Sequence, residues 1–169
     1  MSNKLTIVIP THERQHILAR AINYYEFYNY KIIIVDSSNK KLNYDFKDNF
    51  LYFHFPGCKF CLKIHKIINF IQTDFVSVCP DDDFLINNFL QTAIYNLVNK
   101  KELSSIKGTS VKFKINNNKL YFNKFKKINK KFKKNQFAKI YSNFPNLIYS
   151  VMKKQILIDT VSISKDFDF

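Results

Sequence analysis

Two uninterrupted apolar runs near the N-terminus constrain the fold most strongly. Residues 5–10 read LTIVIP and residues 31–35 read KIIIV. Neither run alternates between apolar and polar side chains, which is typical of strands buried on both faces of a parallel sheet. We expect Pro10 to end the first strand and Thr11 to cap a helix. Strand, helix and strand in this order predict a βαβ unit. The helix is indicated by an apolar stripe at helical spacing: Ile17, Leu18, Ala21, Ile22 and Tyr25.

The same pattern continues along the chain. We expect strands at residues 50–55 and 75–79, amphipathic helices at 60–71 and 87–98, a further strand from Ser105 and a half-buried strand at 111–115. Residues 116–139 interleave lysines with Phe and Tyr, which favours a solvated amphipathic element or a mobile loop. Residues 144–157 regain apolar character. The expected fold class is α/β, a Rossmann-like three-layer sandwich with a mostly parallel central sheet.

Charge and composition exclude some classes of partner. The 169 residues carry a net charge of +14, nearly all of it from lysine. Lysine and asparagine together replace Arg, Gly and Ala, a bias that the nucleotide composition of a genome can produce. We therefore expect no nucleic-acid partner, and allow a basic face toward anionic lipid head groups or acidic glycans.

The location of the protein is predicted from the absence of two sequence patterns, a membrane-spanning apolar run and a signal peptide. The chain has no run of ~18 uncharged apolar residues, and the residues before Leu5 do not resemble a signal peptide. We expect a cytoplasmic protein, with peripheral contact at the inner face of the membrane through its basic surface. Cys58, Cys61 and Cys79 are then expected to be free thiols.

Polar residues follow three of the predicted strands directly. Asp81, Asp82 and Asp83 come just after the strand at 75–79, Asp36 follows the strand at 31–35, and Thr11 with Glu13 follows the first strand. The carboxyl ends of parallel strands open onto one crevice, where α/β proteins bind ligands. We expect a ligand site here, although each acid alone also fits an exposed turn or a helix cap.

The acids suggest what the ligand is. Carboxylate oxygens suit Mg²⁺ or Mn²⁺, which are often held by one or two carboxylates together with phosphate oxygens of the substrate. A metal held by Asp81 and Asp83 would bridge to a diphosphate and neutralise charge on a departing phosphate. Asp36 would accept hydrogen bonds from a base or a ribose.

Three segments resemble the family 2 glycosyltransferases of GT-A fold. They are residues 7–14 (IVIPTHER), 33–38 (IIVDSS) and 78–85 (VCPDDDFL), in order and at suitable spacing, and the resemblance covers about residues 5–107. It implies a GT-A-like core at 1–115 that binds a nucleotide sugar, with 116–169 as a partial acceptor-side region of the same domain. It also implies inverting transfer of a sugar from a nucleotide-diphosphate donor to a glycan or lipid-linked acceptor, assisted by Mn²⁺ or Mg²⁺.

The resemblance assigns roles position by position. Pro10, Thr11 and Glu13 would line the nucleotide pocket, and Asp36 would contact the base. Residues 81–83 match the DXD motif of the family: Asp81 lies toward the ribose and the metal, Asp82 in the donor site between them, and Asp83 on the metal. Lys63 would be a basic contact of the donor.

Two departures from the family pattern stand out. The family commonly has Asn where this chain has Glu13. Its general base is an Asp or Glu well downstream of the DXD motif, and here Asp159 and Asp166 lie in no recognisable motif. The catalytic base is therefore unassigned.

Several other interpretations remain open. A truncated, inactive module that binds nucleotide or metal fits the unassigned base. A nucleotidyltransferase of related fold normally needs a glycine-rich phosphate loop, and this chain has only Gly57 and Gly108. Cys58, Cys61 and His65 with Cys79 would make a zinc site only if all four converged, so ordinary thiols are favoured. A nucleic-acid binder built on the lysine-rich stretch is disfavoured.

Overall fold

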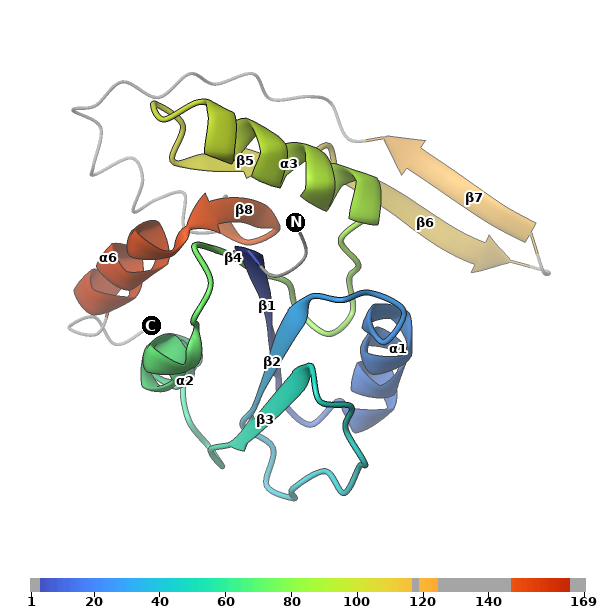
Figure 1. Cartoon of the computed structure of the whole chain (residues 1–169). Coiled ribbons are helices and arrows are strands. Elements are labelled where there is room, and N and C mark those ends of the chain that lie inside the picture. The colour runs from blue at the N-terminus through green and yellow to red at the C-terminus, as the bar shows by residue number, and fades with distance from the viewer. Residues whose placement is uncertain (1–3, 117–118, 125–146, 165–169) are drawn as a thin grey trace.

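The computed structural model describes residues 4–116, 119–124 and 147–164 (Figure 1). A 3-10 turn at Ile68–Phe70 extends the second helix. The described elements in chain order are β1 (Leu5–Thr11), α1 (Gln15–Tyr25), β2 (Lys31–Asp36), β3 (Phe50–His54), α2 (Phe60–Ile67), β4 (Phe75–Val78), α3 (Asn87–Asn99), β5 (Ser105–Lys107), β6 (Val111–Asn116), β7 (Lys119–Lys124), β8 (Ser150–Lys153) and α6 (Lys154–Ser164).

A six-stranded sheet in the order β3-β2-β1-β4-β8-β5 forms the centre of the molecule. β1 pairs in parallel with β2 on one side and with β4 on the other, and β2 pairs in parallel with β3. β8 runs antiparallel to both of its neighbours, β4 and β5. The sheet is therefore mostly parallel, as the continuous apolar runs predict.

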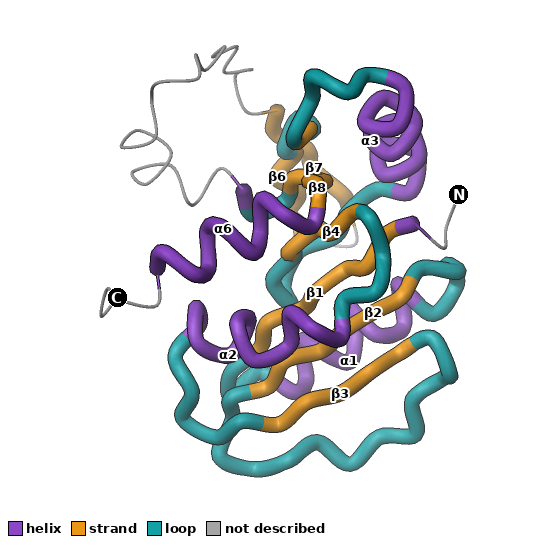
Figure 2. Tube along the Cα trace, turned by 60° about the vertical axis from the view of Figure 1, so that its left-hand side comes forward, coloured by secondary structure: helices purple, strands orange, loops and turns teal. Residues whose placement is uncertain are grey.

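Helices cover both faces of this sheet, giving three layers (Figure 2). Alternate residues of β1 face opposite sides, because side chains along a strand alternate between the two faces. Leu5, Ile7 and Ile9 pack with α1 and α3, whereas Val8 packs with α2 and α6. The three-layer α/β prediction is confirmed.

The strand order reverses beside β1. From β1 the chain moves outward through α1 to β2 and then to β3, and α2 returns it to β4 on the opposite side of β1. Such a reversal leaves a crevice at the carboxyl ends of the central strands, because the connections from neighbouring strands diverge there. The topology therefore places β1 and β4 at the mouth of a ligand site.

The start of α1 differs from the sequence prediction. β1 continues through Pro10 to Thr11, which pairs with Asp36 of β2. α1 begins at Gln15, and its N-cap residue Arg14 makes no side-chain capping bond. The prediction that Thr11 caps the helix is wrong, because its hydroxyl donates a hydrogen bond to Asp81 instead.

The C-terminal part of the sheet was not predicted. β8 lies within residues 144–157, for which the sequence indicated only apolar character, and α6 begins there and continues to Ser164. β8 fills the gap between β4 and β5. The strand expected at residues 111–115 exists as β6, but it pairs with β7 in a separate two-stranded ribbon and Phe113 is exposed. Its predicted half-burial is therefore wrong. Of the lysine-rich segment, residues 117–118 and 125–139 lie outside the described residues.

Candidate functional site

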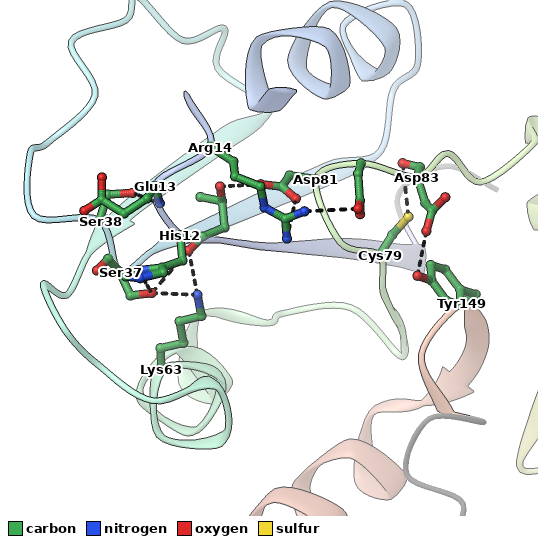
Figure 3. A network of polar contacts seen from close by, with 12 residues as sticks. His12, Glu13, Arg14, Ser37, Ser38, Lys63, Cys79, Asp81, Asp83 and Tyr149 are labelled. Carbon is green, nitrogen blue, oxygen red and sulfur yellow. Dashed lines mark hydrogen bonds and ion pairs between the residues drawn. The ribbon is translucent and has the colours of Figure 1, made fainter. Parts of the chain in front are cut away.

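Thr11 connects the carboxyl ends of three strands through its backbone and its side chain. Figure 3 shows the network of polar contacts to which these bonds belong. Its carbonyl oxygen accepts hydrogen bonds from the Lys63 ammonium at 2.6 Å and the Ser37 amide at 3.1 Å. Its hydroxyl donates to Oδ2 of Asp81 at 2.6 Å. The ends of β1, β2 and β4 are thus joined by polar contacts around one residue.

Lys63 places a positive charge at this junction. The side chain is buried, and its ammonium also donates to Oγ of Ser37 at 3.0 Å. Burial lowers the pKa of Lys63, because it disfavours the charged form, while Asp36 and Asp81 act in the opposite direction. With two of its three N–H groups engaged, the ammonium retains one donor with no partner among the described residues.

Asp81 is completely buried at the end of β4 and faces Arg14. Its Oδ1 accepts no hydrogen bond, but it lies 3.3 Å from Nη2 of Arg14. The other guanidinium nitrogen, Nη1, contacts Oδ2 of Asp82 at 3.0 Å. Burial raises the pKa of Asp81, and the bond from Thr11 and the charge of Arg14 partly counteract this. Arg14 therefore ties two of the three acids to the segment that follows β1.

Asp83 points away from Asp81, toward the start of β8 (Figure 3). The Tyr149 hydroxyl donates a hydrogen bond to Oδ2 of Asp83 at 2.6 Å. Burial and the Asp83 carboxylate raise the pKa of Tyr149, so the phenol stays protonated and can donate. Lys107 lies 5.6 Å from the centre of the Tyr149 ring. Asp83 itself is exposed.

The loop that carries the three acids is held to helix α1 by hydrogen bonds. The backbone N–H of Leu85 donates to the Tyr25 hydroxyl at 3.0 Å, and the Leu85 carbonyl accepts from Tyr24 at 3.1 Å. The Cys79 thiol donates to the carbonyl of Asp83 at 3.4 Å. Burial raises the pKa of Cys79 to about 12, so it remains a neutral donor. Two tyrosines of α1 therefore set the position of the loop.

Asp36 and Glu13 are engaged in contacts within the protein. Asp36 is fully buried, and its two oxygens accept from the backbone N–H of Ser38 at 2.8 Å and the Tyr52 hydroxyl at 2.7 Å. Glu13 accepts from the backbone N–H of Asn39 at 2.7 Å. In this arrangement both acids shape the segments around the crevice.

Backbone strain occurs on both sides of the site. Glu13 has φ 53° and Tyr149 has φ 68°, left-handed values that few residues other than glycine adopt. Asn tolerates this conformation better than Glu does, and Asn is the residue that the family 2 glycosyltransferases commonly have at the position of Glu13. Residues held in such conformations cluster at ligand sites, where the surrounding structure has to enforce them.

A cleft of about 390 Å³ opens at the reversal of strand order. This volume lies within the range of roughly 300–1,000 Å³ typical of small-molecule sites. Residues from the ends of β1, β2 and β4 and from the start of α2 line it: Pro10, Thr11, His12, Arg14, Ser37, Gly57, Cys58, Phe60, Lys63 and Pro80. The sequence predicted Pro10, Thr11 and Lys63 in the site. Asp36, Glu13 and the three acids are not among the residues that line it.

Among the described residues, one arrangement of ligands fits a divalent metal ion. In residues 4–116, 119–124 and 147–164, no three His, Cys, Asp or Glu side chains gather so that they could hold an ion. Asp81 and Asp83 point in different directions, and the Asp81 oxygens face Thr11 and Arg14. The donor set therefore fits an ion held by the exposed Asp83 carboxylate and by phosphate oxygens of a ligand, as is common for Mg²⁺.

Arg14, Ser37 and Tyr149 received no role in the sequence analysis. A signal existed for Arg14, since this lysine-rich chain has arginine only at positions 14 and 20, and a guanidinium fork suits paired carboxylates. Ser37 lay in a recognised motif without a separate role. No sequence pattern indicated a role for Tyr149, because its contact with Asp83 depends on β8, which the sequence did not predict. Of the candidate bases, Asp159 is exposed on α6 and accepts from Gln155, and Asp166 lies outside the described residues.

Comparisons with known proteins bear on the fold. No protein-family model matches the sequence, and no curated protein matches it. Among solved structures, the chain is similar to the bifunctional IspDF from Campylobacter jejuni, with a TM-score of 0.53 and 15% sequence identity. The fold is Rossmann-like. The match covers 99% of this chain and 45% of IspDF, so the chain spans less than half of that protein.

Within the described ranges, no helix combines the length and apolar character needed to cross a membrane. The longest of the described helices named above, α3, has 13 residues and keeps an exposed polar face.

Proposed function

We propose that this chain is the donor-binding part of a glycosyltransferase that resembles family 2. The nucleotide-diphosphate part of a sugar donor occupies the cleft, and the sugar is transferred to a glycan or lipid-linked acceptor with inversion. The observation that carries this proposal is the position of the cleft: it lies where the strand order reverses, at the carboxyl ends of β1, β2 and β4. Rossmann-like folds bind nucleotides at this place.

The charges around the cleft suit a diphosphate. Lys63 has a free N–H among its described contacts, and Arg14 and His12 also line the cleft. Asp81 and Asp82 contact Arg14, so a dianion would meet repulsion from the exposed Asp82 unless a cation screened it. The site thus supports an anionic ligand that arrives together with a divalent metal.

Asp83 is the residue that would hold the metal. Its carboxylate is exposed, and Tyr149 orients it by a hydrogen bond. A Mn²⁺ or Mg²⁺ ion bound there would neutralise charge that develops on the departing diphosphate. Asp81 keeps Thr11 and Arg14 in place, and Arg14 is thereby held at the wall of the cleft. In this scheme Asp81 and Asp83 have different tasks.

Thermal unfolding with a panel of nucleoside diphosphates tests the donor site. A ligand at about a hundred times its dissociation constant stabilises a protein by about 2.7 kcal/mol, which corresponds to roughly 5–10 °C in a domain of this size. We expect a rise of this order with one nucleotide and Mn²⁺ together, and a smaller rise without Mn²⁺. Asp83→Asn should remove the part of the shift that depends on Mn²⁺. Asp48→Asn, in an exposed loop, is the matched control and should keep it.

Product analysis then separates the reactions that one donor site allows. Slow release of free sugar from the stabilising nucleotide sugar supports a glycosyltransferase. Nucleotide binding without sugar release identifies an inactive binding module, and release of pyrophosphate from a nucleoside triphosphate and a sugar phosphate identifies a nucleotidyltransferase. If no nucleotide raises the melting temperature, with or without Mn²⁺, the donor site itself is refuted.

A further inference from the structure

The β6–β7 hairpin stands apart from the central sheet and carries a second binding surface. Its two strands pair with each other and, among the described strands, with no other (Figure 1). An isolated two-stranded ribbon is marginally stable in water, and additional packing is needed to hold it. Binding to something outside the molecule would therefore stabilise the hairpin, and its exposed faces are open to such contact.

One face of the hairpin is apolar and exposed. In an antiparallel pair, directly opposite residues lie on the same face and alternate pairs lie on opposite faces. Phe113 lies opposite Phe122, and Val111 lies two residues before Phe113 on the same face, where it pairs with Lys124 at the end of β7. Phe113 is 45% exposed and Phe122 is 63% exposed. Contiguous exposed apolar side chains mark a binding surface for a protein partner or a membrane.

The opposite face is basic. Lys112 and Lys114 alternate with Val111 and Phe113, and Lys114 lies opposite Tyr121. Both lysines are exposed, and so is Lys119 at the start of β7. The sequence between Glu102 and Asp159 contains no Asp or Glu at all and 14 lysines. The hairpin thus combines an exposed apolar face with an exposed face that carries lysines.

We propose that the β6–β7 hairpin docks on the surface of an anionic lipid bilayer. Its apolar face enters the boundary between head groups and acyl chains, and its lysines meet the lipid phosphates. An amphipathic element at a bilayer surface buries its apolar face by roughly 5–10 Å, which leaves residues of the opposite face at head-group level. Tyr121 suits this depth, because tyrosine favours the membrane–water interface. This inference does not depend on the chemistry of the donor cleft.

Charge and geometry disfavour the other occupants of this face. A second copy of the chain would bring two lysine-rich hairpins together, and such like-charge contacts weaken an interface. Single-stranded nucleic acid binds where lysines flank aromatic rings on one surface. On the basic face Lys114 lies opposite the single aromatic ring of Tyr121, and a nucleic acid bound there would leave Phe113 and Phe122 exposed. An anionic amphiphile can contact the apolar face with its acyl chains and the lysines with its charged head group.

Vesicle sedimentation with the full chain tests the proposal. We compare vesicles of phosphatidylcholine and phosphatidylglycerol with vesicles of phosphatidylcholine alone, at low and at physiological salt. The double variant Phe113→Ser, Phe122→Ser removes the apolar contact, and the triple variant Lys112→Gln, Lys114→Gln, Lys119→Gln removes the basic one. Phe27→Ser is the matched control, because Phe27 is an 87% exposed phenylalanine outside the hairpin.

Binding to the anionic vesicles should weaken at least about tenfold in each hairpin variant, since each basic residue near an anionic surface contributes about 1 kcal/mol and each buried phenylalanine contributes more. Phe27→Ser should bind like the wild type, and all variants should unfold at similar temperatures. The proposal is overturned if the hairpin variants bind like the wild type, or if the wild type binds neither kind of vesicle. It is also overturned if the same variants abolish self-association or RNA binding while vesicle binding persists.

Discussion

Asp81 has no exposed surface, yet it carries the carboxylate at the centre of the polar network. Thr11 supplies one hydrogen bond, and the half-exposed Arg14 supplies one ion pair. A buried carboxylate is stable only when its neighbours replace the water that it has lost, and the Oδ1 atom lacks a hydrogen bond. The raised pKa of Asp81 is the consequence of this incomplete replacement.

The sign of the pH effect follows from that pKa. Since the folded protein holds the Asp81 proton more tightly than the unfolded chain does, this group favours folding below its ordinary pKa of 3.8. Its contribution then declines as the pH rises through the folded-state pKa. Asp81→Asn removes the ionisable group and still offers an oxygen to Thr11. We expect the variant to be as stable as the wild type at pH 7 or more stable by up to about 1 kcal/mol.

Urea unfolding at pH values from about 4 to about 7, in steps of about one pH unit, measures this effect. The wild type should lose more stability over that interval than Asp81→Asn does, and Asp48→Asn should follow the wild type. A variant that is less stable than the wild type by more than about 1 kcal/mol at pH 7 would show that the ion pair with Arg14 outweighs burial.

At the scale of elements, the strands and helices of the core could be predicted because residue type and the spacing of apolar residues indicated the same elements. The strands β1, β2, β3 and β4 and the helix α3 begin where the sequence places them, since runs rich in β-branched residues and stripes at helical spacing both report burial. The alternation in β6 was read correctly as a strand and wrongly as half-buried. Alternation reports an amphipathic element, and it does not report which surface the apolar face meets.

Other elements and contacts depend on packing that no local pattern contains. β8 is a four-residue strand whose place between β4 and β5 is set by pairings with residues far along the chain. The site shows the same limit. The convergence of Thr11 and Asp81 followed from parallel strand ends, and Lys63 was assigned only through the family resemblance. The inward turn of Asp36 depends on a bond from Tyr52. Tyr149 meets Asp83 only because β8 exists.

The loop of acids offers a test at this scale. Tyr25 accepts the backbone N–H of Leu85 and donates to the Cys79 sulfur at 3.6 Å, so one phenol holds both ends of the loop. Tyr25→Phe leaves the buried N–H of Leu85 without a partner, which costs about 1–3 kcal/mol. Urea unfolding should show this loss, whereas Tyr95→Phe, on an exposed part of α3, should stay within about 0.5 kcal/mol. A Tyr25 variant as stable as the Tyr95 variant would show that the phenol does not anchor the loop.

At the scale of the whole molecule, charge is the largest imbalance. The chain has 27 Lys and Arg against 13 Asp and Glu, so even complete pairing would leave 14 basic side chains without an acid. Like charges on a compact molecule repel one another and lower its stability relative to the expanded chain. The repulsion reaches across the fold at low salt, because the Debye length is about 30 Å at 0.01 M and about 8 Å at 0.15 M.

We therefore expect the melting temperature to rise by a few degrees, about 2–4 °C for each kcal/mol of repulsion removed, when NaCl increases from about 0.01 to 0.15 M. The ion pairs of Arg14 with Asp81 and Asp82 weaken over the same range, but Arg14 is half-exposed and such pairs contribute little. Differential scanning calorimetry measures the shift, and KCl in place of NaCl distinguishes screening from binding of one cation. Screening gives the same rise with both salts. A melting temperature that falls with either salt would mean that attraction between local charges, including the network around Asp81, outweighs the repulsion among the lysines.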